Sequence, residues 1–171
     1  MPSRSWSPEQ AHAVLEERAR ALAQPIAALT VGDVLGLISF TLGGEVYALD
    51  SRFVLEVFRP MDVAPLPGAE PPLFGVTAWR GELLPVIDLR SLLGLPATAP
   101  SDRPMLFILG RAQAVLGMSI DAPGEVLAIA EDAIRPPDGI AASEYVRGVA
   151  PAATLVLDAE KILRVAGPES L

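Results

Sequence analysis

Hydrophobic and polar residues alternate with a period of two in the stretch around Phe40, which predicts β-strands and not helices. Ile38 and Phe40 fall on one face of the first predicted strand, and Gly43-Gly44 predicts a two-residue turn after it. Counting across that turn places Tyr47 opposite Phe40 and Leu49 opposite Ile38. The two predicted strands therefore share one apolar face, as paired strands of a hairpin do.

A second hairpin is predicted around the turn Arg80-Gly81. The flanking segments, residues 76–79 and 83–87, are rich in β-branched and apolar residues. Because Pro85 has no N–H to donate to a sheet, the second strand is expected at a sheet edge or with a bulge. Asp88 follows that strand and suits the N-cap of a short helix, since a carboxylate can accept hydrogen bonds from first-turn N–H groups.

The remaining elements follow from the same patterns. They are a helical turn running into a strand over residues 50–58, a proline-rich loop at 65–72, strands at 105–109 and 112–120, a strand at 125–130, a loop at 134–143, strands at 145–150 and 153–157, and a last helix capped by Asp158. Many short strands with few helices indicate a mainly β fold and exclude a parallel α/β sheet.

The two halves of the chain repeat one another. The stretch 40–43 returns at 107–110, 56–57 at 125–126, 75–76 at 148–149 and 84–88 at 155–158. The offsets are about 67–73 residues and the order is kept, which indicates a duplicated β unit. A proline-containing break at residues 96–102 is expected to separate lobe one, about 35–95, from lobe two, about 103–165.

An amphipathic helix is predicted at residues 7–24, ahead of the strands. Ser7 can cap it, Pro8 fits the first helical position, and Gln10 completes a capping box. Apolar residues then recur at helical spacing until Pro25. Two readings stay open: the helix packs on the main body, or it binds a partner or a second copy.

Composition narrows the class of protein. The 171 residues are 51% hydrophobic, which argues against disorder, and no uncharged run reaches the ~18 apolar residues of a membrane span. With no cysteine, disulfides and thiolate metal sites are excluded, and without an apolar leader, cytoplasmic residence is expected. The net charge of −8 makes nucleic acid or direct insertion into an anionic membrane improbable, because both would repel the chain.

The sequence carries no recognisable catalytic constellation. Its single histidine, His12, lies in the predicted first helix. Because the chain has no second histidine and no cysteine, no metal cluster or nucleophile–base pair can form around it. Asp50, Asp88, Asp121 and Asp158 all stand where a strand ends, which is where N-caps and turns place carboxylates. We therefore expect neither an enzyme nor a bound cofactor. A deep apolar pocket with converging polar groups would favour the competing interpretation, a small β-barrel enzyme or ligand binder.

These motifs resemble the CheW-like domain family over residues 35–165. The resemblance is carried by Phe40-Thr41-Leu42-Gly43, Tyr47-Ala48-Leu49-Asp50, Val54-Leu55-Glu56-Val57, Gly75-Val76-Thr77-Ala78-Trp79-Arg80-Gly81, Leu84-Pro85-Val86-Ile87-Asp88-Leu89-Arg90, Gly124-Glu125-Val126, Ile134-Arg135-Pro136, Gly148-Val149 and Leu157-Asp158. It implies two pseudo-symmetric SH3-like β-barrels, each of five strands, with a shared core. It also implies a non-enzymatic adaptor in a chemosensory array, which binds the regulatory domain of a CheA-like histidine kinase and the cytoplasmic tip of a chemoreceptor. A CheW-like scaffold for polar localisation, or for another system outside chemotaxis, is the alternative.

The resemblance also nominates a partner-binding site. Arg80 matches the arginine of the family's Arg-Gly turn, and Glu56 and Val54 match its partner-binding strand, which ends at Phe58. Where the family usually carries Asn-Leu before this turn, the chain has Ala78-Trp79, and a tryptophan beside an arginine is typical of interface hot spots. The simpler readings are a solvated turn arginine and a tryptophan that covers its own barrel.

Overall fold

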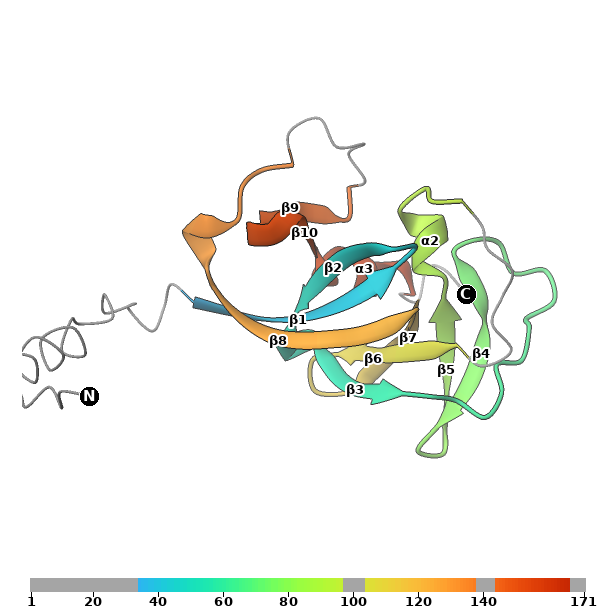
Figure 1. Ribbon diagram of the computed structural model, residues 1–171. Helices are drawn as coiled ribbons and strands as arrows, with labels where there is room; N and C mark the ends of the chain where they lie inside the picture. Colours follow the sequence, from blue (N-terminus) through green and yellow to red (C-terminus); the bar gives the residue numbers. More distant parts are fainter. Residues whose placement is uncertain (1–33, 97–103, 138–143, 167–171) are drawn as a thin grey trace, which may run out of the picture. The chain divides into compact units, whose positions relative to one another are not determined.

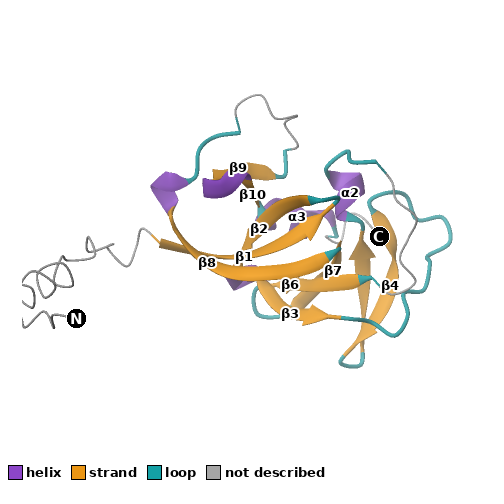
Figure 2. Cartoon of the chain, in the orientation of Figure 1, coloured by secondary structure: helices purple, strands orange, loops and turns teal. Residues whose placement is uncertain are grey.

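The computed structural model describes residues 34–96, 104–137 and 144–166, and these ranges are mostly strands (Figure 2). The chain divides into two units, Met1–Gly32 and Asp33–Leu171, and the structure described here belongs to the second. The amphipathic helix expected at residues 7–24 lies outside the described residues.

Ten strands form two five-stranded sheets. The order in sheet A is β8 (Ala122–Ala130), β1 (Val34–Leu42), β2 (Glu45–Asp50), β10 (Thr154–Leu157) and β9 (Val146–Ala150). The order in sheet B is β3 (Val54–Phe58), β6 (Met105–Gly110), β7 (Ala114–Ile120), β5 (Glu82–Ile87) and β4 (Leu73–Trp79). Short helices connect them: η1 (Ser51–Phe53), α2 (Leu89–Leu92), η2 (Glu131–Ala133), η3 (Pro151–Ala153) and α3 (Ala159–Val165).

The first hairpin has the register that its sequence predicts. Phe40 lies opposite Tyr47 and Ile38 opposite Leu49. Gly43 and Gly44 both have positive φ, at 64° and 89°, which is the left-handed conformation that a two-residue hairpin turn requires. Local turn chemistry and the period-two pattern were therefore enough to determine this pairing.

The duplicated unit is confirmed, but the sheets do not coincide with the two sequence halves. Each sheet joins a hairpin from one half to the last three strands of the other: β1 and β2 lie with β8–β10, and β6 and β7 lie with β3–β5. Figure 1 shows this exchange as blue strands beside orange and red ones. The expected lobes, residues 35–95 and 103–165, are therefore not the sheets. The chain crosses between sheets at η1, directly after β2, and near Asp121, directly after β7.

Each sheet closes on itself to make a small barrel. In sheet B, the segment after β3 reaches β4 through the bridge between Ala64 and Val76. In sheet A, the segment after β8 reaches β9 through the bridge between Arg135 and Val149. Since the outer strands of both sheets are joined in the same way, the two barrels have the same closure.

A shared core lies between the two barrels. Phe40 of β1 and Phe107 of β6 meet edge to face, with ring centroids 5.3 Å apart, and Phe40 stacks on Tyr47. The strands β1, β2, β6 and β7 supply most of this cluster and are buried on both faces, because their other faces fill the separate barrel interiors. The near-continuous burial of β6 follows from that double packing.

Two details go beyond the local reading of the sequence. Pro85 does not lie in an edge strand, because β5 stands between β7 and β4. The predicted alternative, a bulge, has a counterpart close by, since the β4–β5 register shifts opposite Val86 and Ile87. The parallel ladder between β5 and β7 begins only at Val86, one residue after the proline. Asp121 lies in the turn between β7 and β8, which is one of the two positions expected for strand-end carboxylates. Its carboxylate accepts from the backbone N–H of Gly43 at 2.8 Å and pairs with Arg90 at 2.5 Å. It therefore links the β1–β2 turn to α2.

The two barrel closures give a first prediction. A Cβ placed on Gly75 would lie 2.4 Å from the carbonyl oxygen of Ala64, and one on Gly148 would lie 2.5 Å from that of Arg135. Because backbone cannot move away as a side chain can, we expect Gly75→Ala and Gly148→Ala each to lower the free energy of unfolding by about 1–3 kcal/mol in denaturant titration.

Gly36→Ala is the matched control. Its added Cβ would meet the hydroxyl of Ser51 at 2.9 Å, and that side chain can rotate. Equal losses in all three variants would contradict the assignment of Gly75 and Gly148 to close backbone crossings.

Candidate functional site

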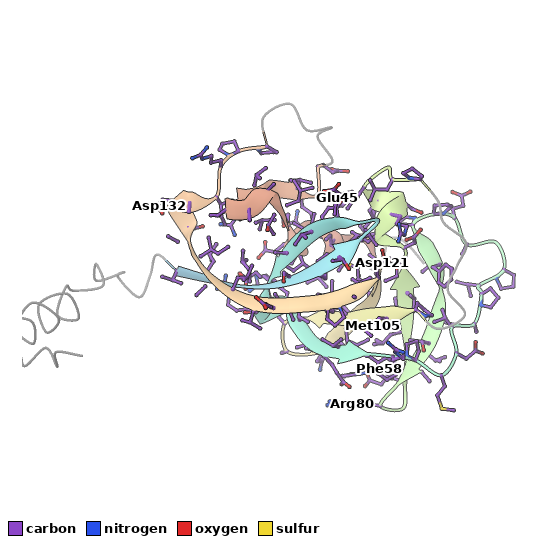
Figure 3. All side chains as sticks on the ribbon, in the orientation of Figure 1. Glu45, Phe58, Arg80, Met105, Asp121 and Asp132 are labelled. Carbon is purple, nitrogen blue, oxygen red and sulfur yellow. The ribbon has the colours of Figure 1, made fainter. Side chains whose placement is uncertain are left out.

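The β4–β5 hairpin places Arg80 at its tip, as labelled in Figure 3. Arg80 and Gly81 both have positive φ, at 48° and 85°, so the turn twists with the flanking strands. Trp79 and Glu82 pair directly below the turn. The tip therefore presents an aromatic and a cationic side chain side by side.

Glu56 of β3 joins these two residues into one cluster. Its Oε2 accepts a hydrogen bond from the indole Nε1 of Trp79 at 3.0 Å and one from Nη2 of Arg80 at 2.9 Å. The guanidinium carbon of Arg80 lies 4.7 Å from the ring centroid of Trp79, which is within cation–π range. Three residues that the sequence nominated separately thus form one hydrogen-bonded group.

Burial divides the roles within this group. The Arg80 side chain is 70% exposed and that of Glu56 is 33% exposed. Trp79 is half-buried and packs, together with Phe58, against the interior of barrel B. Trp79 does cover its own barrel, as the simpler reading held, while it also supports an arginine that faces solvent.

Val54 stands apart from the cluster. It pairs with Leu109 at the start of β3 and packs against the shared core. Of the nominated residues, four therefore gather around the tip of the β4–β5 hairpin: Glu56, Phe58, Trp79 and Arg80. Val54 does not.

The structure adds exposed apolar residues that sequence reasoning missed. Leu83 is 75% exposed and lies opposite Ala78 on the outer face of the hairpin. Met61 is 97% exposed, in the segment that runs to β4, where Thr77 donates to the carbonyl of Asp62 at 2.9 Å. Alternation from the buried Leu84 would have identified Leu83; nothing local distinguishes Met61. We call Glu56, Trp79 and Arg80 at the hairpin tip, together with Leu83 on the outer face of the hairpin and Met61 in the adjoining segment, the hairpin surface.

A second charged site lies at the end of β2. Asp50 is buried, caps η1 through the N–H of Arg52, and binds the Arg52 side chain, with Nη2 at 2.6 Å from Oδ2. Burial alone would raise the pKa of Asp50, but the hydrogen bonds from Arg52 outweigh it and hold that pKa below its usual value of 3.8. Asp50 is therefore ionised in the folded protein near neutral pH.

Neither a metal centre nor a membrane span is found in the part of the chain that the structure describes. No group of three or more His, Asp or Glu residues within residues 34–96, 104–137 and 144–166 could hold a metal ion. In the same ranges no helix is long and apolar enough to cross a membrane.

Comparison with known proteins gives a consistent match. Residues 36–167 match the family model of the CheW-like domain. The chain is 34% identical over 137 residues to the chemotaxis protein CheW of Treponema pallidum, covering 74% of this chain and 80% of that protein. It is 30% identical over 140 residues to the chemotaxis protein CheW of Klebsiella aerogenes, covering 77% and 84%. The solved structure of the scaffolding protein TtCheW from Thermoanaerobacter tengcongensis superposes with a TM-score of 0.62 at 28% identity, covering 72% and 86%.

Packing and charge at the hairpin tip can be separated by substitution. We expect Trp79→Ala to lower the free energy of unfolding by about 2 kcal/mol or more, because it removes a half-buried aromatic from barrel B. Arg80→Gln should change it by less than about 1 kcal/mol, since its ion pair is largely exposed. Trp79→Phe keeps an aromatic ring, so its loss in free energy of unfolding should lie between those of Trp79→Ala and Arg80→Gln. A larger loss in Arg80→Gln than in Trp79→Ala would show that the ion pair, and not the packing, stabilises the tip.

Acid sensitivity tests the Asp50 site. Because its folded-state pKa is lowered, its contribution to stability is fully present above the unfolded value near 3.8 and is lost as pH falls through the lower folded value. We expect Asp50→Asn to melt at a lower temperature than wild type at pH 6, with the gap closing toward pH 3. Asp132→Asn, an exposed carboxylate in η2, is the control. A gap of constant size across this pH range would exclude the assigned role.

Proposed function

Since the chain belongs to the CheW-like domain family, we propose that it is a non-enzymatic adaptor that couples chemoreceptors to a histidine kinase in bacterial chemotaxis signalling. The observation that carries this function is the family match over residues 36–167, together with two relatives named chemotaxis protein CheW. The structural neighbour is itself described as a scaffolding protein. An adaptor acts through its surfaces, so the question becomes which surface meets a partner.

The proposed partners are the regulatory domain of a CheA-like histidine kinase and the cytoplasmic tip of a chemoreceptor. Both are what the family implies for a protein of this kind, and both would place the chain in the cytoplasm at receptor arrays. Within the chain, the hairpin surface is the region whose exposed apolar and charged side chains suit contact with such partners.

The hairpin surface combines the features of a protein interface. Leu83 and Met61 offer exposed apolar area, and an exposed large apolar group on a soluble domain is a candidate contact. Arg80 stands between a fixed carboxylate and an aromatic ring, with only one of its N–H groups bonded to Glu56. Its remaining donors can pair with a partner's carboxylate or carbonyl groups.

Within this proposal the nominated residues have different roles. Arg80 contacts the partner, while Glu56 and Trp79 hold its guanidinium in place. Phe58 supports Trp79 from the barrel interior. Val54 acts from the opposite end of β3, where it fixes the strand against the shared core.

Arg80→Glu tests the proposal directly. The reversal places a carboxylate beside Glu56 and removes the donors offered to the partner, so we expect at least ~30-fold weaker binding to the kinase regulatory domain or the receptor-tip fragment. The thermal midpoint should stay within a few degrees of wild type, because the pair is exposed. Calorimetric titration of the full chain against both partners, with thermal melts in parallel, gives both readouts. Glu56→Arg should behave similarly.

Arg164→Glu, an exposed arginine on α3, is the matched charge reversal and should bind as wild type. Wild-type affinity of Arg80→Glu for both partners would exclude the hairpin surface. Failure of the wild-type chain to bind either partner, with capture of a localisation factor instead, would overturn the adaptor function in favour of a scaffold outside chemotaxis.

A further inference from the structure

The duplicated fold provides two equivalent places that can be compared. Both α2 and α3 begin after a capping aspartate, Asp88 or Asp158. The second residue of each helix reaches a charged partner near a hairpin turn of the opposite sheet: Arg90 pairs with Asp121 beside the β1–β2 turn, and Glu160 pairs with Arg111 in the β6–β7 turn. The position is the same, but the charges are inverted.

The place at α2 is filled. The Arg90 side chain is only 13% exposed, and its partner Asp121 also holds the N–H of Gly43. The neighbouring turn consists of Gly43 and Gly44, so no turn side chain enters. One ion pair, between a mostly buried arginine and a partly exposed aspartate, therefore links the two sheets at this junction.

The place at α3 is a cleft of about 310 Å³. Three arginines from different elements line it: Arg52 of η1, Arg111 of the β6–β7 turn and Arg147 of β9. Three carboxylates, Asp50, Asp158 and Glu160, line it as well. We call this region the arginine cleft. The equivalent junction at α2 uses a single arginine, so the additional guanidiniums here are available for another partner.

Each guanidinium in the arginine cleft keeps unused donors. Arg52 bonds Asp50 through Nε and Nη2, Arg111 bonds Glu160 through Nη2, and Arg147 bonds Glu131 through Nη2. An arginine has five N–H donors, so several remain on each. The guanidinium carbon of Arg111 also lies over the Phe53 ring, 4.8 Å from its centroid, which restricts where its remaining donors can point.

The carboxylates of the cleft differ in how firmly they are held. Asp50 is buried and bonded by Arg52 on both oxygens. Asp158 caps α3 through the N–H of Lys161. The Glu160 side chain is 51% exposed, and among the residues that the structure describes it pairs with Arg111. Glu160 is therefore the carboxylate that an incoming anion could most readily replace.

We propose that the arginine cleft binds a small anion with two or more acid groups, and that Glu160 occupies part of this site as an internal competitor. The planar donors of Arg52, Arg111 and Arg147 suit phosphate or carboxylate oxygens. The cleft volume matches a small ligand and not a folded partner element. This site is separate from the hairpin surface and does not depend on the proposed adaptor function.

Because Glu160 competes with an added anion, removing its charge should raise the affinity of the cleft for that anion. With Glu160 present, the three lining arginines are matched by three lining carboxylates, and Arg147 is also paired with Glu131, so wild-type affinity for an added anion is modest. Replacing Glu160 with glutamine removes the negative charge that is paired with Arg111. A variant that gains affinity cannot be explained by loss of folding.

Calorimetric titration of the full chain with pyrophosphate and with citrate, at constant ionic strength, measures this binding. We expect saturable binding by wild type that tightens about 10-fold in Glu160→Gln, because a like charge is removed from the site. Arg111→Gln and Arg147→Gln should each weaken it more than about 10-fold. The tighter of the two ligands identifies phosphate or carboxylate as the preferred acid group.

Arg59→Gln, an exposed arginine after β3, is the control and should bind as wild type. Three outcomes would overturn the proposal: absence of saturable binding in both wild type and Glu160→Gln, wild-type affinity in Arg111→Gln and Arg147→Gln, or a loss in Arg59→Gln as large as in those two variants. Binding of a hexaglutamate peptide without binding of either small anion would also overturn it, in favour of an acidic protein segment.

Discussion

The back-to-back packing of two hairpins is the constraint on which the rest of this structure depends. Phe40 and Phe107 meet edge to face at the centre of the shared core, and both hairpins are buried on their two faces. A strand in that position must be apolar throughout, and β6 is. Each hairpin completes a barrel with strands from the other half of the chain.

The hairpins that end the two sequence halves carry different side chains at equivalent turns. The hairpins β4–β5 and β9–β10 are carried on opposite sheets, and their turns have the same left-handed backbone: Arg80 has φ 48°, and Ala152 and Ala153 have φ 59°. Only the first turn carries a tryptophan and an arginine. Equivalent backbones with different side chains leave the two barrel ends chemically distinct, which suits an adaptor that meets different partners.

The junctions between the sheets diverged in a similar way. Arg90 is buried against Asp121, whereas Glu160 meets Arg111 near the surface beside an open cleft. The shared apolar core packs the two sheets together, and the charged residues at the two junctions differ around it. The asymmetry of a duplicated fold is thus where both proposed binding regions lie.

The sequence by itself determined the features that depend on residues close together along the chain, namely turns, strand register within a hairpin and helix caps. Glycines in the turn and a period-two pattern specified the register of Phe40 with Tyr47, and strand-end carboxylates at Asp50, Asp88 and Asp158 specified three caps. The internal repeat predicted the duplicated unit for the same reason, since similar local sequences form similar local structure. The family resemblance added the barrels and the nomination of Arg80.

Only the tertiary structure decided which distant segments meet. The exchange of strands between halves left no local signal, because an apolar strand does not encode its partner. The sequence could therefore predict only an edge strand or a bulge at Pro85, and the edge is occupied by β4. The bond from Trp79 to Glu56 joins residues 23 positions apart and depends on barrel closure. Whether Leu83 packs inward or faces solvent depends equally on what lies across the sheet, which no single stretch of sequence contains.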